Sequence, residues 1–156
     1  MFPPQFIVVE RIGSESEIGS KKRLLEVLGG LLASSAPDLT PEAVFERLLE
    51  RERLGSTGLG HGIALPHARM RQVTEAVGAF VQLRKGVAYD AIDDEPVDLA
   101  FAMLVPESAS EVHLQLLSKL AAMFSDPQLR QLLRNAETSA EILELLVGGE
   151  ERANDG

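Results

Sequence analysis

His67 is the residue whose type and position most clearly suggest chemistry. It follows Pro66 and stands at the end of the short apolar run 62–65, which is predicted to be a buried strand. Because proline fixes its own φ and favours an extended residue before it, the backbone that precedes His67 should be rigid. An imidazole in that place is held on one side and open to a partner on the other, and it is a nucleophile when neutral near pH 7.

Groups that could bind an anion precede this histidine in the stretch 51–69, RERLGSTGLGHGIALPHAR. Ser56 and Thr57 offer hydroxyls, and Gly58 lets a backbone N–H group approach an anion closely. Arg51, at the expected end of a helix, offers a planar fork of donors to a phosphate. A nucleophilic imidazole, donors for the oxygens and a cation are what phosphoryl transfer requires, so the stretch makes this chemistry one candidate.

His113 is the second histidine of interest, because it falls in the first turn of a predicted helix just after Pro106. Each of these residues also has a purely structural interpretation. His113 can be an exposed helix histidine, and His67 can be a hydrogen-bonded histidine after a turn. Glycines often mark only turns, and Arg51 belongs to a charged run that is typical of a solvated helix face.

Other site chemistries fit the sequence less well. His61 and His67 are six residues apart, which is not the tight spacing of a catalytic zinc site, so we expect no metal and assign His61 no role. Ser56 lies in G-S-T-G rather than in the G-x-S-x-G of a serine hydrolase. The glycines match neither the dinucleotide fingerprint nor the Walker loop. A ligand-binding module would explain the glycines but not the paired histidines.

Hydrophobic periodicity predicts the elements that must position these residues. Ser20 should cap a helix through Ala33, and Thr40, followed by Pro41, should cap a second helix to about Arg53. Segment 13–19 should be a loop and 148–156 a frayed tail. The predicted strands are 6–9 at an edge, 62–65, 76–83, the short and broken 87–92, and 97–105. The later predicted helices are 111–124, 126–135 and 139–147. Ser110 should cap the first of these helices, and Val112 should lie on its buried face.

This order of elements predicts an α/β fold in which a mixed β-sheet is flanked by helices. The run 97–105 is apolar throughout, which suits a strand in the middle of a sheet covered on both faces. A length of 156 residues is that of one domain. We therefore expect a single layered domain, 1–156, with an ordered core of about 5–147.

Composition and charge exclude several classes of protein. Fifteen basic against 24 acidic residues give a net charge of −9, which argues against a nucleic-acid binder. There are no cysteines, so disulfides and thiolate metal sites are excluded. No apolar run approaches the ~20 residues of a membrane span, and the N-terminal segment lacks the pattern of a signal peptide. We expect a cytoplasmic protein without membrane insertion.

The run LGSTGLGHGIALPHAR resembles the phosphorylation-site signature of enzyme IIA in the fructose, mannitol and nitrogen-regulatory branch of the bacterial phosphotransferase system. Segments 20–26, SKKRLLE, and 91–106, AIDDEPVDLAFAMLVP, are also similar to family segments. The resemblance spans nearly the whole chain and implies the same mixed sheet flanked by helices. It implies that His67 accepts the phosphoryl group and that no metal or organic cofactor is needed. It further implies that His113 orients the imidazole, that Arg51 stabilises the phosphoryl group, and that Ser56, Thr57 and Gly58 bind it.

The same resemblance implies the partners. A small HPr-like carrier protein, itself phosphorylated on histidine, would donate the phosphoryl group. The stretch from LGSTG to PHAR looks closer to the nitrogen-regulatory form, which acts on regulatory target proteins; the alternative is a sugar-specific enzyme IIA that serves an enzyme IIB. We expect the open rim around His67 to include Leu59, Leu65 and Met70.

Overall fold

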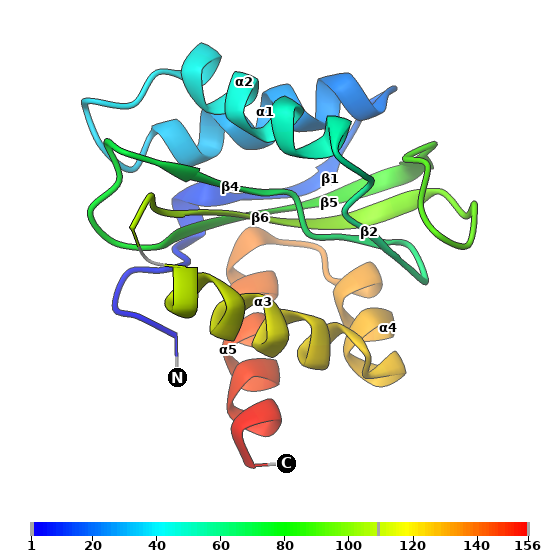
Figure 1. The fold of residues 1–156 in the computed structure, drawn as a ribbon. Helices are drawn as coiled ribbons and strands as arrows, with labels where there is room; N and C mark the ends of the chain where they lie inside the picture. Colours follow the sequence, from blue (N-terminus) through cyan, green and yellow to red (C-terminus); the bar gives the residue numbers. More distant parts are fainter. Residues whose placement is uncertain (1, 109, 156) are drawn as a thin grey trace.

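A six-stranded mixed sheet lies between two layers of helices in the computed structural model, which describes residues 2–108 and 110–155 (Figure 1). Two helices cover one face of the sheet, α1 (Lys21–Ala33) and α2 (Pro41–Arg53). The helices on the other face are α3 (Ser110–Phe124), α4 (Pro127–Asn135) and α5 (Ser139–Asp155). The predicted α/β fold class is therefore confirmed.

The strand β6 organises the sheet, because it pairs with three other strands. The strands are β1 (Ile12–Ser16), β2 (Gly58–Gly60), β3 (Ile63–Ala64), β4 (His67–Met70), β5 (Val77–Val87) and β6 (Val97–Pro106). They are ordered β1-β5-β6-β3-β2, and β4 also pairs with β6. β5 is antiparallel to β6, whereas β3 and β4 run parallel to it, one after the other along its opposite side.

Both central strands are buried on both faces, as the near-continuous apolar runs predict. Along β5, Val77, Ala79 and Val81 join the core beneath α1 and α2. Phe80 joins the core formed with the C-terminal helices. Strand residues alternate between faces, so one sheet separates two hydrophobic cores.

Three of the predicted helix starts are confirmed by hydrogen bonds. The side chains of Ser20, Thr40 and Asp126 each accept a backbone N–H in the first turn of α1, α2 and α4. The helix α2 also has Pro41 at its first position and ends at Arg53, as predicted. The side chains of Ser110 and Val112, the predicted cap and core residue of α3, lie outside the described part of the structure.

The predicted edge strand at 6–9 is wrong. Val9–Arg11 form a 3-10 turn, and all of the strand β1 except Ile12 lies in the segment 13–19, which was predicted to be a loop. The buried guanidinium of Arg11 explains the difference, because it donates to the carbonyls of Gln5, Phe6 and Gly78. The carbonyl of Phe6 also accepts the N–H of Gly78 in β5 at 2.7 Å, so individual bonds to Arg11 and Gly78, and not a strand ladder, satisfy the carbonyl groups here. The polar strand β1 has no apolar alternation from which it could be predicted.

Two further boundaries differ from the prediction. No separate strand exists at 87–92; Val87 ends β5, and the following loop contains Asp90 with a positive φ. Helix α5 continues to Asp155 instead of ending at Val147, with Gly156 outside the described residues. A Cβ at Gly149 would lie 2.8 Å from Leu129, so the glycine lets α5 pass close to α4. In the described residues, no helix has the length and apolar composition needed to cross a membrane.

The turn between β2 and β3 requires glycine at Gly62. His61 and Gly62 both have positive φ, 56° and 81°. A Cβ at Gly62 would lie 2.4 Å from Nη2 of Arg134 and 2.6 Å from Oδ1 of Asp98. These two side chains form an ion pair of 2.9 Å, which ties α4 to this end of the sheet. The turn thus leads the chain from β2 into β3, and so toward His67.

We predict that Gly62→Ala lowers the free energy of unfolding by roughly 2–4 kcal/mol, because the new methyl group is strained by φ and displaces the ion pair. Urea denaturation measures the change. Gly30→Ala in α1 is the control, because a Cβ there meets nothing within 4 Å. It should leave stability unchanged or raise it by up to about 1 kcal/mol. Equal stability of Gly62→Ala and wild type would contradict the argument.

Candidate functional site

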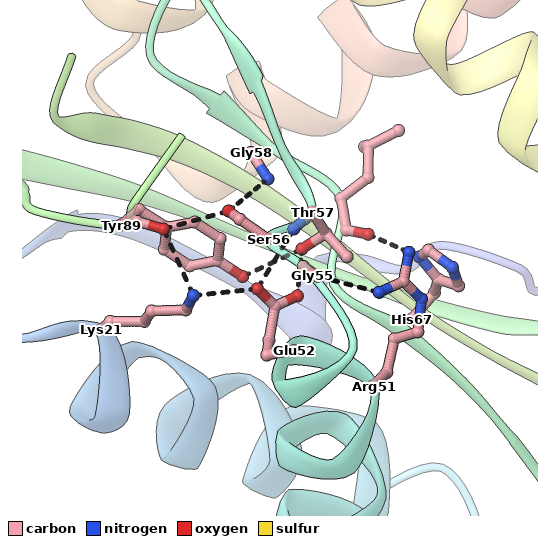
Figure 2. A network of polar contacts seen from close by, with 10 residues as sticks. Lys21, Arg51, Glu52, Gly55, Ser56, Thr57, Gly58, His67 and Tyr89 are labelled. Carbon is pink, nitrogen blue, oxygen red and sulfur yellow. Dashed lines mark hydrogen bonds and ion pairs between the residues drawn. The ribbon is translucent and has the colours of Figure 1, made fainter. Parts of the chain in front are cut away.

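His67 begins β4, and one hydrogen bond fixes its imidazole. Successive side chains of a strand point to opposite faces of the sheet. Because Ala68 faces α1 and α2, the imidazole of His67 points to the other face, toward α3. Nδ1 lies 2.7 Å from the carbonyl oxygen of Leu65 (Figure 2). Because a carbonyl only accepts hydrogen bonds, Nδ1 carries the proton and Nε2 of the neutral ring keeps its lone pair. Of the two ring nitrogens, only Nε2 therefore has a lone pair available to a ligand.

His113, predicted to support His67, lies directly beside it. The two ring centroids are 4.9 Å apart, and the rings meet edge to face at 79°. His113 is only 6% exposed, so it is not the exposed helix histidine of the alternative interpretation. Its Nδ1 is buried and has no hydrogen-bond partner among the described residues. A histidine that is buried without a structural hydrogen bond at Nδ1 is unusual, and it suggests a role for the rest of the ring.

Both imidazoles are held neutral at pH 7. Burial lowers the pKa of His67, with a smaller contribution from Arg51, while the hydrogen bond to Leu65 acts in the opposite direction. Burial, together with the smaller effects of the neighbouring His67, Arg69 and Arg51, lowers the pKa of His113 to about 4. Neutral His67 has the free electron pair that a nucleophile needs.

Arg51 projects from the last turn of α2 toward His67 (Figure 2). Its Nη1 donates to the carbonyl of Gly55 at 2.9 Å, which leaves other guanidinium N–H groups for a ligand. Arg51 and His67 both line two adjoining hollows, of about 640 Å³ and about 320 Å³. The larger is also lined by Arg47, Arg69 and one acidic residue, Glu50. The charge around His67 is therefore positive, opposite in sign to the net charge of the chain.

Ser56, Thr57 and Gly58 lie in the loop beside Arg51, but their donors already have partners within the protein (Figure 2). The Ser56 hydroxyl donates to the carbonyl of Tyr89 at 3.0 Å, and the N–H of Gly58 donates to Ser56 Oγ at 3.1 Å. The Thr57 hydroxyl donates to the carboxylate of Glu52. In this arrangement the three residues shape the loop, and their predicted contact with a phosphoryl group stays a prediction.

A buried polar cluster behind this loop was not predicted. The carboxylate of Glu52 is bonded by Lys21 Nζ at 3.1 Å and by the N–H of Thr57 at 3.1 Å. The Tyr89 hydroxyl lies 3.1 Å from Thr57 Oγ1, and burial together with Glu52 raises the pKa of Tyr89 well above its usual range. Apart from the place of the Arg51-Glu52 pair in the resemblance to enzyme IIA, no sequence signal separates Glu52 from the other charges of the run ERLLERER. Arg69, in contrast, lies in the PHAR motif and could have been included.

The third histidine has a different environment. The N–H of His61 donates to Asp93 at 2.9 Å, and its carbonyl accepts from Arg134. Its side chain is exposed, and its positive φ marks it as a turn residue. Among residues 2–108 and 110–155, no three His, Asp or Glu side chains are grouped so that they could hold a metal ion.

The rim of the site is apolar but differs from the predicted one. Leu59 is 42% exposed, as expected. Leu65 lines the smaller hollow beside His67 but is buried, and Met70 is buried in the core beneath α1 and α2, so neither forms the exposed rim. Two other leucines, Leu54 and Leu114, line the larger hollow and are 84% and 64% exposed. They could not be identified from the sequence, because the exposure of Leu54, which follows the end of α2, and of Leu114 in α3 depends on tertiary packing.

The fold is of the α/β class, and the family to which the chain belongs is one of phosphoryl-transfer proteins. Residues 5–148 match the family described as "Phosphoenolpyruvate-dependent sugar phosphotransferase system, EIIA 2". The chain belongs to this family, and the resemblance to enzyme IIA is confirmed.

Relatives and solved structures agree with this assignment. A nitrogen regulatory protein of Pseudomonas aeruginosa is 44% identical over 129 residues, which span 83% of this chain and 84% of the relative. The crystal structure of nitrogen regulatory protein IIA-Ntr from Neisseria meningitidis has a TM-score of 0.86 at 45% identity and covers 90% of this chain and 96% of its own. In the complex of enzyme IIA mannitol with phosphorylated enzyme IIB mannitol from Escherichia coli, the matching chain has a TM-score of 0.76 at 25% identity. The match covers 91% of this chain and 97% of the chain in the complex.

Acid should destabilise the protein through His113. The unfolded histidine takes up a proton near pH 6.5 and the folded one only near pH 4, so the unfolded state binds more protons in between and stability falls as the pH is lowered. Between pH 7 and pH 5, wild type should lose roughly 1–2 kcal/mol more than His113→Gln. Urea denaturation at the two pH values measures this. Parallel losses in the two proteins would show that His113 does not titrate as argued.

Proposed function

We propose that this chain is a histidine phosphocarrier that accepts a phosphoryl group on Nε2 of His67. The observation that carries the proposal is the hydrogen bond from His67 Nδ1 to the Leu65 carbonyl, which leaves Nε2 as the ring nitrogen with a lone pair. Membership of the EIIA family of the phosphotransferase system supports phosphoryl transfer as the reaction.

The donor in this proposal is a small HPr-like carrier protein that bears a phosphohistidine. The lone pair of His67 Nε2 forms the new P–N bond, while the P–N bond to the carrier breaks and its electron pair returns to the carrier's imidazole. No proton needs to move during this exchange. Once Nε2 is bonded to phosphorus, the ring becomes positively charged with a proton on Nδ1, and the carbonyl dipole of Leu65 stabilises that charge.

Arg51 and His113 are the groups best placed to assist the transfer. The free guanidinium N–H groups of Arg51 can bond phosphoryl oxygens and offset their charge. The buried Nδ1 of His113 has no acceptor nearby in the described residues. Because an unsatisfied N–H is more costly to bury than a bare nitrogen, we assign the proton of His113 to Nε2. A neutral Nε2–H group is a donor that can orient the phosphoryl group beside His67.

The carrier must bring its own histidine within reach of Nε2, and the exposed rim suits that contact. Leu54, Leu59 and Leu114 offer apolar surface around a polar, positively charged centre. Such a surface fits a transient complex of modest area. The positive centre would attract the phosphoryl group itself, which the two proteins exchange.

We favour a nitrogen-regulatory role, in which the phosphorylation state of the protein controls regulatory target proteins. The relative from Pseudomonas aeruginosa and the solved structure from Neisseria meningitidis are both named nitrogen regulatory proteins, at 44% and 45% identity. The alternative is transfer onward to an enzyme IIB in sugar uptake. It is favoured by the mannitol enzyme, whose complex with phosphorylated enzyme IIB has been solved, but this relative is only 25% identical.

His67→Ala should abolish phosphorylation. Wild type incubated with phosphoenolpyruvate, enzyme I and the carrier protein should gain one acid-labile phosphoryl group, detected by mass spectrometry of the intact protein. His61→Asn is the matched control, because His61 is exposed and asparagine tolerates its positive φ. It should be labelled like wild type. Full labelling of His67→Ala would show that another residue is the acceptor.

Arg51→Ala should slow phosphoryl transfer by roughly 10–1000-fold, the range for removing one group that stabilises charge in a transition state. Its stability should change little, because the side chain makes a single hydrogen bond to the Gly55 carbonyl. Arg53→Ala, which removes an exposed arginine two residues further along α2, is the control. Quench-flow measurement of single-turnover transfer compares the three proteins. If both arginine variants react at the wild-type rate, Arg51 is only part of a solvated helix end.

A further inference from the structure

Glu52 is a buried carboxylate that lies next to Arg51 in α2 but points away from it (Figure 2). Its side chain is only 3% exposed. A buried carboxylate is costly unless donors surround it. Here the ammonium of Lys21 and the N–H of Thr57 bond Oε1, both at 3.1 Å, and the Thr57 hydroxyl bonds Oε2. Two of the three donors belong to one residue, Thr57.

Thr57 is therefore clamped by both its backbone and its side chain. Because its single hydroxyl hydrogen goes to Glu52, Thr57 Oγ1 accepts the hydrogen bond from the Tyr89 hydroxyl. Lys21 closes the group from the other side, since its Nζ lies 4.4 Å from the centroid of the Tyr89 ring and donates to the Tyr89 carbonyl. The position of Thr57 is thus fixed by its bonds to Glu52, through the backbone N–H and the hydroxyl, and by the bond from the Tyr89 hydroxyl.

The fixed backbone of Thr57 leads to the nucleophile through two hydrogen bonds. The carbonyl of Thr57 accepts the N–H of Leu65 at 3.0 Å. The carbonyl of Leu65 in turn accepts Nδ1–H of His67 at 2.7 Å. Pro66 restricts the backbone between these two residues. A continuous route of bonded groups thus runs from the Glu52 carboxylate to the imidazole ring.

We propose that Glu52 is a positioning residue for His67. Glu52 holds Thr57 and Leu65 in place, so that the imidazole proton of His67 stays on Nδ1 and Nε2 stays free to react. This inference rests on the proposed function, because it assigns Glu52 a part in the same transfer. Glu52 does not touch the phosphoryl group. It acts by keeping the Leu65 carbonyl where only one tautomer of His67 can bond it.

The physical reason is that the proton of a neutral histidine can occupy either ring nitrogen. When the Leu65 carbonyl is well placed, the Nδ1–H form gains a hydrogen bond that the Nε2–H form lacks. If the loop loosens, that advantage shrinks and the share of rings with the proton on Nε2 rises. Those rings have no lone pair on Nε2, so they cannot accept a phosphoryl group there.

The variant Glu52→Gln tests this role, because glutamine keeps the size and an acceptor oxygen but loses the charge that binds Lys21 and the Thr57 donors. Thr57→Val is the second variant; it keeps the backbone N–H but removes the hydroxyl, and Thr57→Ser restores the hydroxyl. The matched control is Glu150→Gln. Glu150 is 4% exposed at its side chain and pairs with Lys119 at 3.3 Å, between α3 and α5. It is comparable in burial and charge but contacts α3 rather than the loop.

Two readouts are needed, and the first does not depend on phosphoryl transfer. Nitrogen-15 NMR of the His67 ring in the unphosphorylated protein reports which nitrogen carries the proton. Wild type and Glu150→Gln should show the proton on Nδ1, and Glu52→Gln and Thr57→Val should shift toward the Nε2–H form. The single-turnover rate from the phosphorylated carrier should fall roughly 10–100-fold in these two variants, the range for losing an outer-shell group that orients a histidine. Thr57→Ser should restore both values.

The outcomes separate the inference from the proposed function. If wild type takes no phosphoryl group on His67, the proposed function fails, and the NMR result alone decides whether Glu52 orients the ring. If wild type is phosphorylated but Glu52→Gln keeps the wild-type tautomer and rate, the positioning role is overturned. Lower stability and a slower rate in Glu52→Gln and Glu150→Gln alike, without a tautomer change, would also overturn it. If Glu52→Gln does not fold, the comparison of Thr57→Val with Thr57→Ser gives the same decision.

Discussion

The hydrogen bond between His67 Nδ1 and the carbonyl of Leu65 is the constraint on which the site depends. It requires the backbone to leave one short strand and enter another within two residues, with a carbonyl pointing back toward the side chain that follows. Pro66 supplies the fixed φ for this path, and its own carbonyl accepts the N–H of Met103 on β6 at 3.0 Å. The central strand of the sheet thus supports the imidazole ring through the backbone, in addition to the bonded route that runs through Thr57 and Leu65.

The site combines groups that are unfavourable to bury, and the fold compensates for each in a different way. The two imidazoles are kept neutral by desolvation and by the nearby arginines, so no buried positive charge has to be stabilised on the rings. Glu52 is compensated by Lys21 and Thr57. Arg51 remains at the surface end of α2, where its charge is partly solvated. The polar cluster lies behind the loop and the reactive groups lie in front of it, so the two do not compete for donors.

Much of the scaffold could be predicted because its signals are local. The side chain of Thr40 and the ring of Pro41 define the start of α2 within a few residues, and the apolar run of β6 can only be a covered strand. The pairing of His67 with His113 could not be derived this way, since it depends on β4 and β6 lying side by side; only the family resemblance implied it. Glu52 illustrates the remaining limit, because its burial is decided by Lys21 and Tyr89, which are far from it in the sequence. The segment at 6–9 was predicted wrongly for the same reason, since the carbonyl of Phe6 is bonded from outside the segment, by the guanidinium of Arg11 and the N–H of Gly78.

Under the proposed function, the hydrogen bond at Nδ1 also means that His67 can react only through Nε2, from the side that faces the hollows. A carrier that delivers a phosphoryl group and a protein that removes it both have to approach Nε2 along the same direction, and a third protein that covers the leucine rim would block both. Delivery of the phosphoryl group, its removal and the binding of a regulatory partner then exclude one another, because all three use the surface around Nε2. The lifetime of the phosphorylated form is then set by competition among partners for this surface. It depends on their relative concentrations as well as on the chemistry of the P–N bond.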